Sequence, residues 1–249
     1  MMAFTIAGRE LRTMFLSPLA WSILGVIQII LGFLFLRVLD IYVNDIQPRY
    51  AGFEQMPGVT EAIVAGWFQD VGIILLFVTP LLTMRLISEE RRNRTLSLLF
   101  TAPVTIAEIV LGKYLGVVAF LFIMIGMISL MPLSLLLGGG LDFGKLAACF
   151  LGLGLLLAGF ASLGLFISAL ASQPTVAAIS TFGALLLLWI LDWSRNAAGG
   201  VLEYLSMMHH YGRLLKGLVS TTDLVYFALF ILAFLVLSIH TLDNDRLQK

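Results

Sequence analysis

Six long apolar stretches constrain the fold of this chain more than any other feature of its sequence. A helix that crosses the roughly 30 Å hydrocarbon core of a bilayer needs about 20 mostly apolar residues. Stretches of this kind cover residues 18–36, 67–87, 114–137, 146–170, 174–191 and 224–240. Because backbone polar groups cannot stay unpaired in lipid, each stretch must form a helix. The sequence therefore predicts an all-α, polytopic membrane protein with six transmembrane helices in one domain over residues 1–249.

The composition excludes an ordinary soluble protein. Charged residues make up 12% of the chain, hydrophobic residues make up 60%, and the mean hydropathy is +1.01. A soluble domain carries roughly 25% charged residues, so this chain has about half of the usual number. The chain has one cysteine, Cys149, which lies inside an apolar stretch. Because there is only one, an intrachain disulfide and a cysteine metal site are excluded.

The distribution of Lys and Arg predicts the orientation in the membrane. With the N-terminus inside, nine of these residues face the cytoplasm: Arg9, Arg12, Arg85, Arg91, Arg92, Arg94, Lys113, Arg246 and Lys249. Six face outside: Arg37, Arg49, Lys145, Arg195, Arg213 and Lys216. Because cytoplasmic loops carry the excess of positive charge, we expect a multi-pass protein of the bacterial cytoplasmic (inner) membrane with both termini in the cytoplasm.

The N-terminal segment, residues 1–17, mixes apolar positions with Arg9, Glu10 and Arg12. This pattern predicts an interfacial helix along the inner leaflet. A cleavable signal peptide is the alternative. It is disfavoured because the apolar run that begins at Pro18 is too long for a signal peptide and no small-residue cleavage site follows it.

The two long outer segments are residues 37–66 and 192–222. The first carries several acidic residues, which either bind a cation or only solvate a connector, and we favour the connector. The second carries Trp193, Tyr204 and Tyr211, which predict short helices at the outer leaflet that either gate a lateral opening or anchor the fold. We interpret the adjacent pair His209 and His210 as a surface feature.

The cytoplasmic segment 88–112 is a polar interruption with a regular pattern. A charged beginning is followed by apolar residues at helical spacing, which predicts a short amphipathic helix around Glu89 to Thr101. Pro103 ends this helix, and Thr105 with Glu108 forms a capping box that opens the next one. The candidate residues for contact with a partner are Glu89, Glu90, Arg91, Arg92, Arg94, Thr95, Leu96, Leu99, Phe100, Thr101 and Pro103.

Small residues four apart in two of the spans predict close helix packing. Gly112 and Gly116 lie at the start of the third span, and Ala158 and Ser162 lie within the fourth. Small side chains allow two helix backbones to approach each other in a membrane. We interpret both pairs as packing positions within the six-helix unit and not as ligand sites.

The sequence shows little chemistry of its own. No GxxxxGK[ST] motif is present, because Lys113 is followed by Tyr114 and Lys145 by Leu146, so the chain does not bind ATP through a P-loop. We predict no catalytic, metal or cofactor site in this chain and no nucleic-acid partner. The spans contain almost no ionisable residues, which argues against a proton- or sodium-driven carrier.

One short motif is a decoy. Glu89, Glu90 and Arg94 form EExxxR, which is similar to the first motif of the glutamic intramembrane proteases. That family also needs an FxxxH motif, and no histidine of this chain has Phe four residues before it. We therefore set the protease interpretation aside.

Three segments resemble the ABC-2 type permeases, and most closely the GldF-like branch associated with gliding-motility-type ABC transporters. They are RELRTMFLSPLAW (residues 9–21), MRLISEERRNRTLSLLFTAPVTIAEIVLGK (84–113) and YGRLLKGLVSTTDLVYF (211–227). The second segment is similar to the coupling-helix region of the family. It departs from the usual pattern at Arg94, where Gly is common, and at Ser97, where Glu is common. These departures leave the helix break and one ion pair with the partner open.

The resemblance implies an ABC-2, type V exporter-like permease with an N-terminal interfacial helix and a cytoplasmic coupling helix. Separate ABC ATPase subunits would bind ATP and Mg, and a second permease copy or a related permease subunit would complete the membrane pathway. ATPase closure would push on the helix around Glu89 to Thr101, with Arg91, Arg92 and Arg94 as candidates for ion pairs with the ATPase. The alternative for these arginines is positive-inside topology alone.

Two other functions remain in competition. The first is a non-transporting membrane subunit that transmits ATPase motion to an extracytoplasmic partner protein, as in gliding-type machinery. The second is a secondary carrier, which would work without an ATPase. The spans contain few polar groups. This composition is compatible with a non-transporting subunit and also with a permease whose lipid-like substrate moves along the bundle surface.

Overall fold

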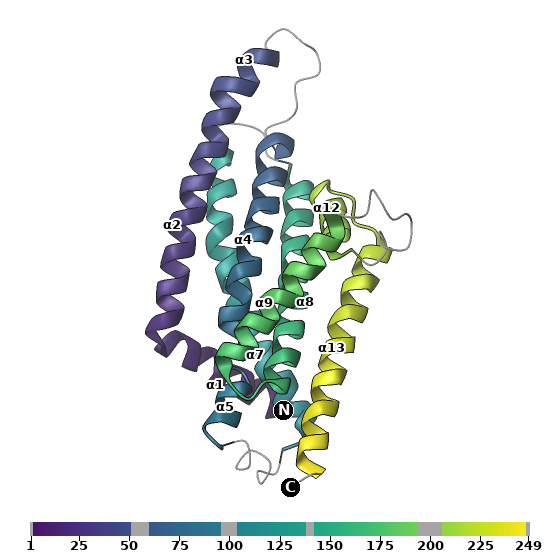
Figure 1. Cartoon of the computed structure of the whole chain (residues 1–249). Helices are drawn as coiled ribbons and strands as arrows, with labels where there is room; N and C mark the ends of the chain where they lie inside the picture. Colours follow the sequence, from purple (N-terminus) through teal and green to yellow (C-terminus); the bar gives the residue numbers. More distant parts are fainter. Residues whose placement is uncertain (1, 51–59, 96–103, 138–141, 194–205, 248–249) are drawn as a thin grey trace.

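The computed structural model describes residues 2–50, 60–95, 104–137, 142–193 and 206–247. Within these residues every regular element is a helix and no strand occurs, which confirms the all-α prediction. Long helices run side by side along one axis (Figure 1). They are α2 (Pro18–Ile41), α4 (Gly66–Thr83), α7 (Ile106–Ser134), α8 (Phe143–Leu170), α9 (Pro174–Trp193) and α13 (Thr221–Leu247).

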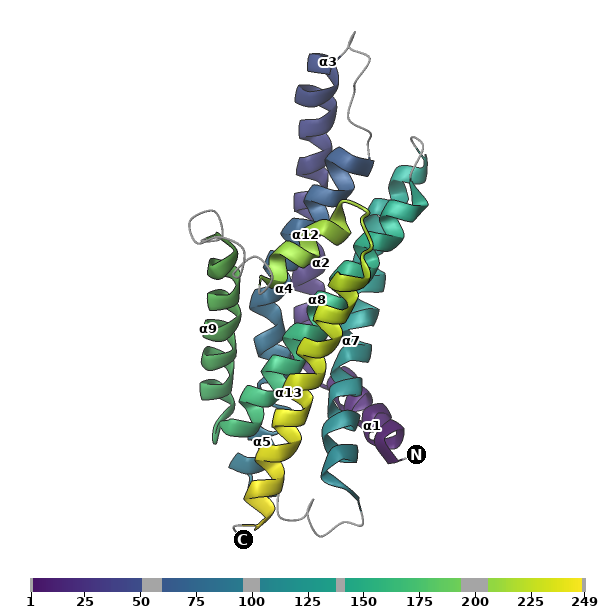
Figure 2. The same cartoon turned by 90° about the vertical axis from the view of Figure 1, so that its right-hand side faces the viewer.

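Shorter elements lie at the two ends of this bundle. They are α1 (Met2–Leu16), α3 (Gln47–Tyr50), α5 (Ser88–Arg92), α12 (Met207–Leu215), two π-helical turns (Tyr42–Ile46 and Thr60–Ala65) and a 3-10 turn (Leu135–Leu137). Helices α1 and α5 lie at the same end as the two chain termini, and α12 lies toward the other end (Figures 1 and 2). Termini at one end are what an even number of membrane crossings requires. We call the end with α1 and α5 the charged end.

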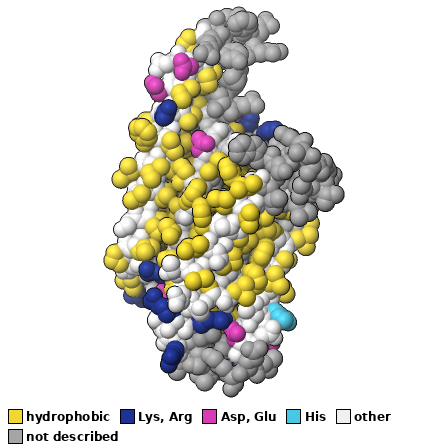
Figure 3. All heavy atoms as spheres, viewed as in Figure 1, with side chains coloured by type: hydrophobic (Ala, Val, Ile, Leu, Met, Phe, Trp, Pro, Cys, Tyr) yellow, Lys and Arg dark blue, Asp and Glu magenta, His cyan; other side chains and the backbone are white. Residues whose placement is uncertain are grey.

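Among the described residues, five helices are long and apolar enough to cross a membrane: Pro18–Ile46, Ile63–Arg92, Ile106–Ser134, Phe143–Leu170 and Thr221–Arg246. Hydrophobic side chains cover the middle of the visible face, and a group of Lys and Arg side chains gathers near its lower end (Figure 3). The chain is therefore a multi-pass membrane protein. The predicted span 174–191 corresponds to α9, whose apolar part, Pro174–Ile190, is a shorter helix. The count of six spans stays a prediction.

Helix α8 is the centre of the bundle, since it contacts α4, α7, α9, α12 and α13. Glycines allow the closest of these approaches. A Cβ atom at Gly164 would lie 2.3 Å from Oγ1 of Thr83 in α4, and one at Gly154 would lie 3.0 Å from the Phe122 ring of α7. Ser162 is fully buried but donates its hydroxyl hydrogen bond to Gly159 O in its own helix. Ala158 is half-buried, and its carbonyl oxygen accepts a hydrogen bond from the Tyr114 hydroxyl.

Helix α1 packs across α7 at Gly112 and Gly116. A Cβ atom at Gly112 would lie 2.6 Å from Cβ of Ile6, and one at Gly116 would lie 2.8 Å from Cβ of Glu10. Both distances are shorter than real Cβ atoms show, so only glycine fits there. The partner of this pair is thus the N-terminal helix, which the sequence did not identify.

Candidate functional site

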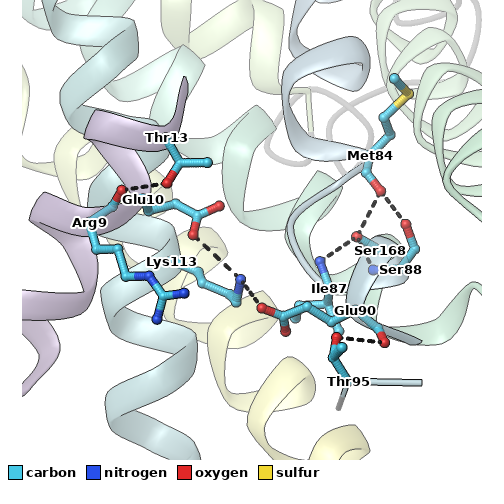
Figure 4. Close-up of polar contacts among 10 residues, drawn as sticks. All are labelled: Arg9, Glu10, Thr13, Met84, Ile87, Ser88, Glu90, Thr95, Lys113 and Ser168. Atoms are coloured by element: carbon cyan, nitrogen blue, oxygen red, sulfur yellow. Dashed lines mark hydrogen bonds and ion pairs between the residues drawn. The ribbon is translucent and has the colours of Figure 1, made fainter. Parts of the chain in front are cut away.

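The segment between α4 and α5 is held to α8 by a single serine hydroxyl. Ser168 Oγ accepts hydrogen bonds from the backbone N–H groups of Ile87 and Ser88, each at 3.1 Å. The same hydroxyl donates to the carbonyl oxygen of Met84, also at 3.1 Å (Figure 4). Ser88 is itself buried, and its hydroxyl donates to Met84 O. One side chain therefore satisfies three backbone groups left over where α4 stops, which fixes the position of α5 on the bundle.

Arg91 joins α5 to two further helices. Its guanidinium forms an ion pair with Asp245 in the last turns of α13, and Nη2 donates to the carbonyl oxygen of Ala169 at 2.6 Å. Ala169 is the second-to-last residue of α8, so the cation also caps that helix C-terminus. The prediction of an ATPase contact for Arg91 stays untested, but within the chain this side chain already holds α5, α8 and α13 together.

Lys113 joins α1, α5 and α7. Its ammonium lies 2.8 Å from Glu90 Oε1 of α5 and 3.5 Å from Glu10 Oε2 of α1, and only 6% of its side chain is exposed (Figure 4). The second carboxylate oxygen of Glu90 is buried and has no hydrogen-bond partner among the described residues. The negative charge of Glu90 is therefore balanced by the ammonium of Lys113. Removal of this buried cation would leave two partly buried carboxylates uncompensated, which costs far more than the loss of a surface pair.

The last residue of α5 and the three residues after it lie at the surface. Arg92, Asn93, Arg94 and Thr95 are exposed, and Glu89 is half-buried. The distance of 3.9 Å between Arg92 and Glu89 is that of a weak surface pair. The remaining predicted contact residues, Leu96, Leu99, Phe100, Thr101 and Pro103, lie outside the described residues. The structure thus divides the predicted set into residues that hold α5 in place and residues that present an outward surface.

The predicted helix from Glu89 to Thr101 is not continuous, because α5 ends at Arg92, and its part from residue 96 onward lies outside the described residues. The amide of Thr95 donates to Glu90 O and the amide of Arg94 donates to Arg91 O, which together form a Schellman motif. Arg94 occupies the left-handed position of this motif, with φ of 57°. Glycine favours this position because it has no Cβ atom. In the permeases that this segment resembles, Gly is common at the position of Arg94. The helix ends here in the left-handed conformation that glycine favours, although the residue is an arginine.

Arg94→Gly is expected to stabilise the protein by about 1 kcal/mol, since a left-handed residue with a side chain costs about 1–2 kcal/mol. Thermal unfolding in detergent checks this, with Asn93→Gly as the control. Asn93 is the exposed C-cap with φ of −81°, so glycine offers no relief there. A lower melting temperature for Arg94→Gly than for the native protein would contradict the assignment of strain to this residue.

Helix α7 begins with the predicted capping box. Thr105 Oγ1 accepts a hydrogen bond from the Glu108 amide at 3.3 Å, and Glu108 Oε2 accepts one from the Thr105 amide at 3.2 Å. This confirms the prediction from the sequence. It also fixes the start of the helix that carries Lys113, two turns further on.

The opposite end of the bundle contains a second polar cluster. His210 of α12 is 2% exposed, and its Nδ1 lies 2.7 Å from Oδ1 of Asp223, a fully buried residue in the first turn of α13. Arg213 lies 3.6 Å from the same carboxylate oxygen. The interpretation of His210 as a surface feature is therefore wrong, because Asp223 lies 13 residues further along the chain and pairs with it. Within the described residues no cluster of three or more His, Cys, Asp or Glu could hold a metal.

Tyr211 fixes α12 to the bundle beside this cluster. Its hydroxyl donates to the carbonyl oxygen of Phe68 at 2.6 Å, and its ring packs over Gly72 of α4. Burial raises the pKa of the Tyr211 phenol well above its usual value, so the hydroxyl stays protonated and remains a donor. Short helices were expected in this outer segment, and α12 is one. Its buried contacts indicate a structural element of the bundle.

Comparison with known proteins gives one family. The model of a family described as "ABC-2 family transporter protein" matches residues 37–240. Comparison with curated proteins finds no match. The matched region includes α5, Lys113 and all the described helices except α1 and part of α2 and α13.

Proposed function

The chain belongs to the ABC-2 transporter family, and from this premise we propose that it is the membrane-spanning permease subunit of an ATP-driven exporter. A separate ABC ATPase would bind ATP and Mg, and a second permease copy or a related subunit would complete the pathway. We place both termini and α5 on the cytoplasmic side of a bacterial inner membrane. The gliding-motility-type branch is proposed from the resemblance of residues 9–21, 84–113 and 211–227.

The proposed ATPase contact is the outward surface of residues 92–95, and the contact residues predicted from the sequence between Leu96 and Pro103 lie outside the described residues. Arg92 and Arg94 are exposed cations at the charged end of the bundle, and Arg92 has only a weak partner. Exposed arginines of this kind form bidentate pairs with carboxylates of a partner protein. Glu89 borders the same surface. The observation that carries the proposal is this exposed surface on a helix that is otherwise fixed to the bundle.

The proposed transmission path runs from that surface into the spans. Ser168 and Arg91 connect α5 to α8 and α13, and Lys113 connects it to α1 and α7. A push on α5 would therefore move four other helices, because packed helices respond as rigid elements. Such a path is what a subunit without its own ATP site needs in order to use ATPase motion.

The test is co-purification with the ABC ATPase encoded beside this chain. We expect a stable complex that hydrolyses ATP, and we expect Arg92→Glu to weaken ATPase retention about tenfold, since a charge-assisted pair becomes a repulsive one. Arg246→Glu is the matched control, because Arg246 is an exposed arginine of α13 near the same end. The proposal fails if no ATPase is retained, or if both variants lose it equally.

A second candidate function is transmission of ATPase motion to an extracytoplasmic partner without transport. Helix α2 continues through the turn at Tyr42–Ile46 into α3 and extends past the other helices at the outer end (Figures 1 and 2). This extension offers a surface for an envelope protein. Truncation of residues 44–60 would separate the two functions. If the chain is a transporting permease, the truncation should leave transport by reconstituted vesicles intact. If the chain only transmits ATPase motion, the truncation should abolish the activity of the extracytoplasmic partner.

A further inference from the structure

A cleft opens at the charged end of the bundle where α1 meets α2. Its volume is about 130 Å³, and it lies between α1, the first turn of α2, the last turn of α4 and α5. Its walls combine leucines, such as Leu19 and Leu81, with the charged residues Glu10, Arg85 and Glu89. The cleft is large enough for a small polar group but not for a complete amphiphile.

Among the described residues that line this cleft, Arg85 is the one cation. Its side chain is exposed and makes no hydrogen bond or ion pair with another described residue. Lys113, by contrast, does not line the cleft, and its ammonium is paired with the carboxylates of Glu10 and Glu90. An unpaired arginine over a cleft is a ready site for a phosphate group, because its planar guanidinium matches two phosphate oxygens.

Two carboxylates line the same cleft. Glu10 is engaged by Lys113, whereas the one ion pair of Glu89 with a described residue is the 3.9 Å contact with Arg92. Glu89 is therefore available to a cationic group on the ligand. With two acids and one arginine, the wall disfavours a ligand that is only anionic, because like charges repel in a partly desolvated site.

The position of the cleft along the bundle axis, near the expected height of the lipid headgroups, indicates that its ligand is a lipid. Trp21 lies near the same α1–α2 junction, is 58% exposed and donates its indole N–H to Phe15 O. Tryptophan is enriched at the height of lipid headgroups. Toward the spans the cleft is bordered by Leu81, which is 44% exposed, so an acyl chain can follow the apolar surface of α4.

We propose that this cleft binds the headgroup of a zwitterionic phospholipid with a primary amine, of the phosphatidylethanolamine class. The phosphate pairs with Arg85 and the ammonium pairs with Glu89. A choline headgroup has the same charge, but its methyl groups cannot donate a hydrogen bond to the carboxylate. A glycerol headgroup has no cation at all. The site shares Glu89 with the border of the proposed ATPase contact, but the permease alone contains all of it.

Native mass spectrometry of the delipidated permease tests this with three lipids that share the same acyl chains. They carry ethanolamine, choline or glycerol headgroups. We expect the ethanolamine lipid to bind about tenfold more tightly than the other two, which is the effect of one charge-assisted hydrogen bond. Arg85→Gln should weaken binding of both zwitterionic lipids, whereas Glu89→Gln should remove only the preference for ethanolamine over choline.

Arg12→Gln is the matched control, because Arg12 is an exposed arginine of α1 that does not line the cleft. It should leave all three affinities unchanged. Equal binding of the three lipids would overturn the proposal, as would a preference for the glycerol lipid. A preference for ethanolamine that survives both Arg85→Gln and Glu89→Gln would place the lipid elsewhere and would overturn it as well.

Discussion

Lys113→Met is expected to destabilise the protein by about 3 kcal/mol and to uncouple ATP hydrolysis from the permease. Methionine keeps the length of the side chain but removes the cation, so Glu10 and Glu90 face each other across a buried position without compensation. Breaking a buried ion pair by removal of one partner costs about 3–5 kcal/mol. The lower value applies because both carboxylates keep 24% of their side-chain exposure.

Denaturant unfolding in mixed micelles measures the stability, and stimulation of the bound ATPase measures the coupling. Lys216→Met is the control, because Lys216 is an exposed lysine at the opposite end. The triple variant Glu10→Gln, Glu90→Gln and Lys113→Met should recover most of the lost stability, since no buried charge remains. If Lys113→Met is as stable as the native protein, the three helices are not held together by this network.

The pair Gly112→Ala and Gly116→Ala is expected to release α1 from α7. Each added Cβ atom meets atoms that cannot rotate away, namely Ile6 Cβ at 2.6 Å and Glu10 Cβ at 2.8 Å. Overpacking of this kind costs about 1–3 kcal/mol per site. The second substitution also shifts Glu10, which strains its pair with Lys113. We therefore expect Gly116→Ala to lose more stability than Gly112→Ala, and the double variant to lose no more than the sum of the two, because both substitutions act on the same α1–α7 contact.

Hydrogen exchange of residues 2–16 detects the release, because a helix that detaches loses its slow amides. Gly126→Ala is the control on the same helix, since no atom lies within 4 Å of a Cβ at that position. It should be neutral or slightly stabilising, because alanine is the better helix former. Unchanged exchange of α1 in the double variant would show that α1 does not depend on this contact.

The sequence alone predicted the helical architecture and the family. Apolar run lengths fix which segments enter a membrane, and a capping box such as Thr105 with Glu108 is a local pattern that can be read directly. The small-residue pattern at Gly112 and Gly116 indicated a close contact. It could not identify α1 as the partner, because residue spacing describes one helix and contains no information about the second.

Long-range polar contacts were the part that the sequence did not reveal. Arg91 and Asp245 lie 154 residues apart, and α13 was expected to end at residue 240. A polar continuation without Gly or Pro, as in residues 241–246, was the available indication that the helix goes on beyond the membrane. His210 was misread for the same reason, since its burial depends on Asp223 in another helix. Local patterns do not show which distant charge will meet a given residue.

The central claim is that residues 92–95 form the surface to which an ABC ATPase binds. A photo-crosslinking amino acid at position 93 tests it most directly, because Asn93 is the exposed C-cap of α5. The same probe at position 216, at the opposite end of the bundle, is the reference. The account predicts a crosslink to the ATPase from position 93 and none from position 216. A complex that forms and hydrolyses ATP but gives no crosslink from position 93 would contradict it.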